Sequence, residues 1–156
     1  MSITYCELNE EHISDIVLYV KEHQFDGNHY VQYKQIISLS TLRYMLFNDS
    51  VYIYAAVLDN DIKFLAILTY SINRTWSTAM DIQFISLDEQ FIRQLISNLT
   101  KSDYNKHLFY TTKLKAFLVK EQLYLEGKFK SLGFVNELIL TSEEFNKSIH
   151  HYAHFL

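Results

Sequence analysis

The sequence predicts a single α/β domain that spans residues 1–156. Runs with the two-residue period of strands alternate along the chain with segments that have the helical period. The clearest junction lies at residues 124–134, where a lysine-dotted helical segment reaches Gly133 and an apolar strand follows at once. Glycine is the usual residue just past a helix end, because positive φ is needed there. A chain of 156 residues, 49% of them hydrophobic, can bury one core without a second domain.

The N-terminal part is expected to form a strand at residues 3–8 and then a helix capped by Asn9. One apolar stripe marks this helix: Ile13, Ile16, Val17, Val20. Residues 23–33 are expected to be a loop rich in aromatic and polar side chains. A second helical region should end near Phe47.

Three strands are predicted in the middle of the chain. Residues 51–58 and 62–72 are expected to form a hairpin, because Asp59, Asn60 and Asp61 make a short turn signal between two β-rich runs. Residues 78–86 are the third strand. The period then changes, so that Asp88 begins a helix with one apolar side: Phe91, Ile92, Leu95, Ile96, Leu99.

The C-terminal part is expected to contain a strand at residues 107–112, the lysine-dotted helix at 117–132 and a strand at 134–140. The last segment, 141–156, supports two interpretations. Thr141 and Glu144 make a capping box, and apolar residues then follow at helical spacing. Alternatively, residues 149–156 form a final strand that makes a hairpin with 134–140.

Composition excludes several classes of protein. The net charge of −4 argues against binding to duplex nucleic acid. No run of eighteen apolar residues occurs, and the start of the chain lacks a basic and apolar leader, so we expect a cytoplasmic protein without a membrane partner. The single cysteine, Cys6, allows no internal disulfide, which agrees with a reducing compartment.

Charge is unevenly spread along the chain. Residues 1–99 contain six Lys or Arg against twelve Asp or Glu, whereas residues 100–135 contain seven lysines against three acidic residues. The basic segment could attract a ligand that carries phosphate. The alternative is that these lysines are the solvated faces of one helix and its loops.

The order of the elements, together with the segment FKSLGF at residues 129–134, resembles the GNAT acyltransferase superfamily. Members of that family often close on a tyrosine-x-x-leucine-glycine-phenylalanine segment. The resemblance implies a single mixed, largely antiparallel sheet flanked by helices and splayed between its fourth and fifth strands. It also implies transfer of an acyl group from coenzyme A to an amine, and it favours a final strand over a helix at the C-terminus.

Two residue patterns depart from that family. Its members place a glycine-rich turn before the helix that follows the fourth strand, where backbone amides hold a pyrophosphate. The corresponding residues here, 84–93, contain no glycine, and Asp88 and Glu89 would stand at those amides and repel a second anion. Phe129 occupies the place of a tyrosine that protonates the departing thiolate, and phenylalanine has no proton to donate.

Candidate site residues follow from the resemblance and from the residue types. If acetyl-CoA or another acyl-CoA binds, the strand backbone at Phe84, Ile85 and Ser86 is expected to hold the pantetheine arm, and Lys113 and Lys115 the phosphates.

Asp81 lies inside the apolar run AMDIQF, where burial would raise the pKa of its carboxyl toward that of a useful base. The alternative is an Asp at an edge or loop, paired with a donor. Tyr124 is not expected to replace the missing acid, because five positions along a helix turn it about 500° away from the face of Phe129.

The loop between the first two helices is the candidate acceptor site, because in GNAT-like folds this segment lines the acceptor pocket. Its candidate residues are His23, Asp26, His29, Tyr30, Tyr33. The alternative is a surface loop whose aromatic side chains close over the core. His150, His151 and His154 lack further ligands at suitable spacing, so no metal site is predicted.

Two classes of function remain. In the first, the chain is a divergent N-acyltransferase that uses an acyl-CoA and a small-molecule or peptide amine. In the second, it is a non-catalytic binding protein that keeps the fold, has lost coenzyme A binding, and contacts a protein partner or a second copy of itself in a homodimer.

Overall fold

A computed structural model describes residues 2–23, 27–29, 38–48, 50–70, 79–100, 113–142 and 147–156 of the chain. Its strands are β1 Thr4–Glu7, β2 Gly27–His29, β3 Val51–Leu58, β4 Asp61–Tyr70, β5 Ala79–Ser86, β6 Lys113–Val119, β7 Val135–Ser142 and β8 Lys147–Phe155. Its α-helices are α1 Ile13–Glu22, α2 Leu39–Phe47, α3 Glu89–Thr100 and α4 Glu126–Ser131. Two 3₁₀ segments, η1 Glu10–His12 and η4 Lys120–Leu125, precede α1 and α4.

The described strands form one eight-stranded sheet in the order β1-β3-β4-β5-β6-β8-β7, and β2 pairs with β5 outside this row. The β5–β6 pair is parallel, and the other pairs are antiparallel. This confirms the predicted mixed, largely antiparallel sheet flanked by helices. None of the helices among the described residues is long and apolar enough to cross a membrane.

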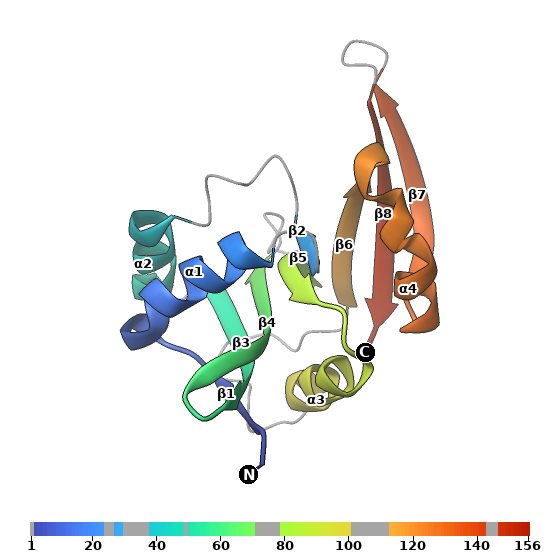
Figure 1. Cartoon of the computed structure of the whole chain (residues 1–156). Coiled ribbons are helices and arrows are strands. Elements are labelled where there is room, and N and C mark those ends of the chain that lie inside the picture. Colours follow the sequence, from blue (N-terminus) through green and yellow to red (C-terminus); the bar gives the residue numbers. More distant parts are fainter. Residues whose placement is uncertain are drawn as a thin grey trace.

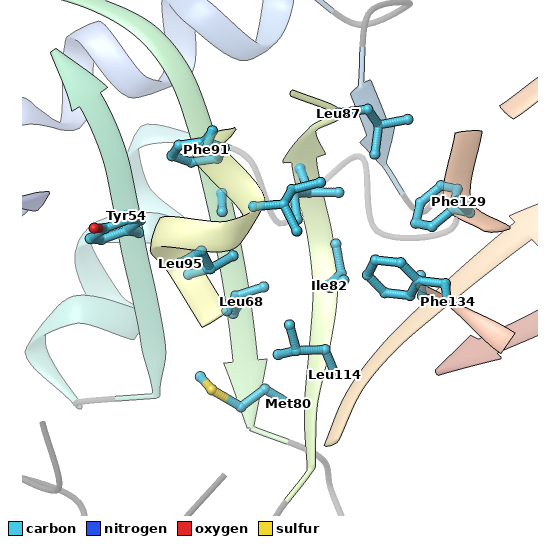
Figure 2. Packing of buried hydrophobic residues seen from close by; sticks show 14 of the residues in the cluster. Tyr54, Leu68, Met80, Ile82, Leu87, Phe91, Leu95, Leu114, Phe129 and Phe134 are labelled. Atoms are coloured by element: carbon cyan, nitrogen blue, oxygen red, sulfur yellow. The ribbon is translucent and has the colours of Figure 1, made fainter. Parts of the chain in front are cut away.

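Two hydrophobic cores lie on opposite faces of the sheet (Figure 1). Helices α1 and α2 cover one core, in which Ile16 and Leu42 pack against Ile53 and Ile67. Helices α3 and α4 cover the other core. Figure 2 shows Phe91 of α3 near Tyr54, and Phe129 of α4 near Phe134, in this core.

The N-terminal prediction is confirmed in detail. Asn9 Oδ1 accepts a hydrogen bond from the Glu11 amide at 3.0 Å, which caps η1 and leads directly into α1. The predicted apolar stripe of α1 is buried against the sheet: Ile13, Ile16, Val17, Val20. The spacing of these residues therefore set the face that the helix buries.

The β3–β4 hairpin is also confirmed, with a turn shorter than expected. Asp59 and Asn60 have φ of 52° and 66°, and Asp61 is already the first residue of β4. Two consecutive residues with positive φ make the primed turn that fits the twist of a hairpin, and Asp and Asn tolerate this region best after glycine.

A β-bulge interrupts β5 at Gln83. Ile82 pairs with Leu68 and Phe84 with Ile67, which leaves Gln83 between them without a partner residue on β4. In a regular strand, Ile82 and Phe84 would share one face. Here they lie in opposite cores, because the extra residue reverses the alternation.

The sequence-based boundaries around β6 are wrong. Residues 117–119 belong to β6 rather than to the predicted helix, because they pair with the β8 residues His151, His150 and Ile149. The helical part starts at η4 and becomes α-helical at Glu126. The strand predicted at residues 107–112 lies outside the described residues.

One further element differs from expectation. Residues 23–33 were predicted to be a loop, yet Gly27–His29 is a strand. At the C-terminus, the strand interpretation is confirmed and the helix is excluded, because β8 pairs with β7 on one side and β6 on the other. Tyr152 and Ala153 are consequently buried at the centre of this three-stranded part.

The junction between α4 and β7 forms as predicted. Gly133 has a φ of +93°, and the Phe134 amide donates to the Phe129 carbonyl oxygen at 3.0 Å, which ends the helix. A Cβ atom on Gly133 would lie 3.0 Å from Nε2 of His154. The positive φ therefore favours glycine at this position, and a Cβ atom would also require the His154 ring to shift by a few tenths of an ångström.

Replacing Gly133 with alanine is expected to lower the free energy of unfolding by about 1–3 kcal/mol, because alanine is strained at this φ. Gly127→Ala is the matched control. Gly127 lies inside α4, and a Cβ atom there would meet nothing within 4 Å, so alanine should raise the free energy of unfolding by about 0.5–1 kcal/mol. Urea unfolding of the two variants measures both values. Equal changes in the free energy of unfolding of the two variants would show that the positive φ at position 133 does not strain alanine.

Candidate functional site

The parallel strands β5 and β6 are paired over a short distance and then separate. Ala79, Met80 and Asp81 pair with Lys113, Leu114 and Lys115. Beyond this point, β6 continues to pair with β8, and the described residues contain no pairing between β6 and the second half of β5. On the C-terminal side of Asp81, the two halves of the sheet therefore separate, and we call the gap between β5 and β6 the opening.

Strand β2 lies in this opening, beside β5 (Figure 1). Gly27 pairs with Ser86, Asn28 with Ile85 and His29 with Phe84. Ile85 also pairs with Ala66 of β4, so β5 has a paired strand on both of its edges at this residue. The three residues predicted to hold a pantetheine arm, Phe84, Ile85 and Ser86, thus already have a strand on the open side.

The side chain of Ser86 is engaged inside the protein. Its Oγ accepts a hydrogen bond from the Leu65 amide at 3.0 Å and lies 3.2 Å from the Tyr19 hydroxyl. The Tyr19 hydroxyl donates to the Lys63 carbonyl oxygen at 2.7 Å, so Ser86 is the donor toward Tyr19. This network joins α1, β4 and β5, which gives Ser86 a structural role independent of any ligand.

The N-terminus of α3, which follows directly after β5, is capped by the chain itself. Asp88 Oδ1 accepts a hydrogen bond from the Phe91 amide at 2.9 Å. Glu89 forms an ion pair with Arg93 one turn later. The predicted filling of this helix end by Asp88 is confirmed, and a second anion would meet two carboxylates here.

Phe129 of α4 is fully buried in the core that α3 and α4 cover. Its ring meets that of Phe134 edge-on at 4.9 Å and stacks on that of Tyr152 at 6.0 Å between centroids. Tyr124 is exposed on η4, and that it does not replace a missing acid stays a prediction. Tyr152 was not among the predicted site residues, because it lies in the segment whose structure was left open.

Tyr152 places a hydroxyl close to the position of Phe129. The hydroxyl oxygen is buried, and no group among the described residues meets it with full hydrogen-bond geometry. Burial raises the pKa of Tyr152, and the nearby Glu126 carboxylate adds to the rise against an opposing effect of Asn136. Tyr152 is therefore protonated at neutral pH and is able to donate.

A group of charged side chains lies on the sheet at the closed end of the opening, and we call Asp81, Lys113, Lys115, Glu137 and His151 the charged cluster. Asp81 Oδ1 lies 3.3 Å from Nζ of Lys115, and Lys113 Nζ lies 2.6 Å from Oε1 of Glu137. His151 packs edge-on against Phe117 at 4.6 Å. The strand alternation points the intervening residues Leu114 and Ala116 into the opposite core.

Burial changes the titration of two members of the charged cluster. It raises the pKa of Asp81, whose side chain is 18% exposed, while the Lys115 ammonium and, more weakly, His151 act in the opposite direction. Burial also lowers the pKa of His151, and Lys115 adds to this effect. At neutral pH the His151 imidazole is therefore neutral, and the Lys115 ammonium favours the ionised form of Asp81 against the effect of burial.

The structure separates some residues that the sequence-based hypothesis grouped. Lys113 and Lys115 lie beside the start of β5, whereas the α3 N-terminus follows its end, about 16 Å farther along the strand from Asp81. Both lysines already face carboxylates. Their assignment to cofactor phosphates stays a prediction, and this geometry favours a role at the closed end of the opening instead.

The candidate acceptor residues are only partly described. His23 ends α1, where its ring stacks on Tyr19 at 3.9 Å and its Nδ1 donates to the Tyr19 carbonyl oxygen at 2.9 Å. The backbone of His29 pairs with Phe84. The remaining three, Asp26, Tyr30 and Tyr33, lie outside the described residues.

The three C-terminal histidines lie on a strand rather than a helix. Residues 150 and 154 are therefore about 13 Å apart along β8, too far to share one ion. Within the described residues, no three His, Cys, Asp or Glu side chains are grouped so that they could hold a metal ion.

Similarity to known proteins is found in the fold and not in the sequence. No protein-family model matches the chain, and no curated protein matches it. Solved structures do match along nearly its whole length. A GNAT-family acetyltransferase from Streptococcus pneumoniae superposes with a TM-score of 0.71 at 10% identity, covering 99% of each chain.

Two other solved structures are similar. A chimeric spermidine N-acetyltransferase from Vibrio cholerae has a TM-score of 0.65 at 18% identity, over 99% of this chain and 96% of that one. A ribosomal-protein-S5-alanine acetyltransferase from Vibrio fischeri has a TM-score of 0.65 at 9% identity, over 99% and 93%.

This chain has the GNAT fold. Once β2 is set aside, β5 and β6 are the fourth and fifth strands of the sheet, and the splay that the GNAT resemblance implied lies between them. The helix that follows the fourth strand is α3. In this fold, β2 pairs with β5 inside the splay, Asp88 caps the helix that follows β5, and Phe129 lies in the core that α3 and α4 cover.

The ion pair in the charged cluster can be tested by titration. Lys115→Met is expected to raise the pKa of Asp81 further, because the effect of burial then acts with less opposition. Lys113→Met, on the same strand but paired with Glu137, should change this pKa less. NMR titration of the Asp81 carboxyl carbon measures both variants. An unchanged or lower pKa in Lys115→Met would contradict the assigned pairing.

The raised pKa of Asp81 also predicts a pH dependence of stability. The folded protein holds this proton more tightly than the unfolded chain, so the free energy of unfolding should fall as pH rises from about 4 through the raised pKa. Asp81→Asn should remove this contribution, and Asp15→Asn, at an exposed position of α1, is the control. Denaturant unfolding between pH 3 and 7 gives the slope of each variant. Identical slopes in the wild type and Asp81→Asn would contradict the prediction.

Proposed function

We propose that the chain is an acyl-CoA-dependent N-acyltransferase that acts on a small-molecule or peptide amine. The observation that carries this proposal is the separation of β5 and β6 after Asp81, in a fold shared along nearly the whole chain with acetyltransferases. Such a splay gives an extended ligand access to the backbone of a central strand, which a continuous sheet would cover. The acyl-CoA is a substrate here, because it is consumed in each turnover.

The charged cluster provides the proposed acceptor side of the reaction. The amine nitrogen attacks the thioester carbonyl carbon, a C–N bond forms, and the C–S bond breaks with its electron pair on sulfur. Asp81 takes the proton released by the amine, and the thiolate takes a proton from solvent. The Lys115 ammonium, 3.3 Å from Asp81, opposes the effect of burial and favours the ionised carboxylate that this role requires. Most of the acceleration would come from positioning, so a tyrosine at position 129 is not required.

A second candidate function is favoured by specific observations. The α3 N-terminus is capped by Asp88, and the residue at position 129 is an apolar Phe in the core. These features are those of a protein that keeps the GNAT fold without binding coenzyme A. Such a protein would bind a protein partner or a second copy of itself.

Ligand-induced stabilisation separates the two functions. Acetyl-CoA or coenzyme A at a hundredfold excess over its Kd should stabilise an acyltransferase by about 2.7 kcal/mol, a shift in Tm of roughly 2–8 °C. A thermal-shift titration measures the shift, calorimetry gives the Kd, and adenosine 3′,5′-bisphosphate is the control ligand without a pantetheine arm. If millimolar acetyl-CoA leaves Tm unchanged, the binding-protein function is preferred.

The two carboxylates at the α3 N-terminus should weaken coenzyme A binding. Asp88→Ser/Glu89→Gln keeps a capping oxygen, removes both negative charges and frees Arg93 from its partner. We expect coenzyme A to bind about 3- to 30-fold more tightly to this variant.

Glu10→Gln/Glu11→Gln is the matched control for charge, since these exposed residues on η1 belong to no part of the candidate site. It should leave the Kd unchanged. Equal Kd values for the wild type and both variants would show that the pyrophosphate does not approach the α3 N-terminus.

A further inference from the structure

Strand β2 occupies the part of the splay that the proposed function requires. Its three residues pair in register with Phe84, Ile85 and Ser86 on the side of β5 that faces β6. Neighbouring strands lie about 4.8 Å apart, and each backbone edge accepts one extended partner at a time. An extended ligand that hydrogen-bonds to this edge therefore cannot bind while β2 is in place.

We propose that β2 is a self-inhibitory strand, which blocks the pantetheine edge of β5 and must leave it before an acyl-CoA can bind. This inference rests on the proposed function, because it assumes that the edge of β5 is where the pantetheine arm binds. The pantetheine arm carries two amide groups, so it would replace the backbone groups of β2 with groups of the same kind.

The pairing of β2 is suited to exchange. Among the described strands β2 pairs with β5 alone, so one short ladder holds it, whereas every other inner strand of the sheet has a partner on each side. It begins with Gly27, and glycine loses more conformational freedom than other residues when it enters a strand. Its departure would leave the β4 side of β5 paired as before.

Displacement lowers the apparent affinity for the ligand by a calculable factor. The apparent Kd is the intrinsic Kd divided by the fraction of molecules in which β2 is away from β5. A strand that is docked in nine molecules of ten therefore weakens binding about tenfold, and one docked in ninety-nine of a hundred weakens it about a hundredfold. Preventing β2 from pairing should recover this factor.

Proline substitutions test the proposal. Asn28→Pro removes the amide of the central residue, and Gly27→Pro/His29→Pro removes the amides of the two flanking residues. Between them, these variants remove every N–H that β2 could donate to β5. At least one of them should bind coenzyme A about tenfold or more tightly than the wild type, measured by calorimetry. Asn28→Ala keeps the backbone amide and is the matched control, with an unchanged Kd.

The outcomes distinguish this proposal from the proposed function. If the wild type and both proline variants bind coenzyme A with the same measurable Kd, β2 is not inhibitory, although the acyltransferase function stands. If coenzyme A binds to none of the variants, including Asp88→Ser/Glu89→Gln, the proposed function fails and this inference fails with it. If a proline variant binds coenzyme A more tightly than the wild type while Asn28→Ala does not, the result supports both the self-inhibition by β2 and the acyltransferase function.

Hydrogen exchange of the wild type provides a readout that does not depend on a variant being folded. On addition of saturating coenzyme A, the amides of residues 27–29 should lose protection, because they leave β5. Those of residues 66–70, on the opposite side of β5, should keep theirs. Binding of coenzyme A with unchanged or increased protection at residues 27–29 would overturn the proposal.

Discussion

The fold depends on the short parallel contact between β5 and β6. Three residue pairs join the four-stranded N-terminal part of the sheet to the three-stranded C-terminal part. Just beyond this contact, the bulge at Gln83 bends β5 and increases its twist, so the strand leaves β6, and Ile82 and Phe84 enter opposite cores. The splay, the position of α3 and the charged cluster beside Asp81 all follow from where this contact begins and ends.

Around the splay, backbone groups that a bound ligand could contact are already paired with other groups of the chain. Asp88 accepts from the first turn of α3, and β2 pairs with the exposed edge of β5. Phe129 is fully buried in the core, and its ring has no proton to donate. Buried or half-buried backbone groups need partners, so such internal pairing stabilises the protein without a ligand. A ligand at this site has to compete with these contacts, which links its affinity to the conformational freedom of the chain.

Features that depend on local conformation could be predicted from the sequence. Gly133 ended a helix and Asp59-Asn60 closed a hairpin because each site needs a backbone conformation that few residue types tolerate. The helix prediction over residues 117–119 was wrong because the conformation there depends on pairing with a distant strand and not on local sequence. Phe117 fits a helical stripe as well as a strand, and its pairing with His151, far along the chain, decided the outcome.

The sequence by itself determined the capping of α3 by Asp88 and the lack of a phenol at position 129, because both follow from residue identity and immediate neighbours. Only the tertiary structure decided that Gly27–His29 lies in the splay and that Tyr152 stacks on Phe129. A three-residue strand is too short to show a period, and its partner on β5 is more than fifty positions away. Such pairings depend on which backbone edges the rest of the sheet leaves open, and the sheet assembles from contacts between distant residues.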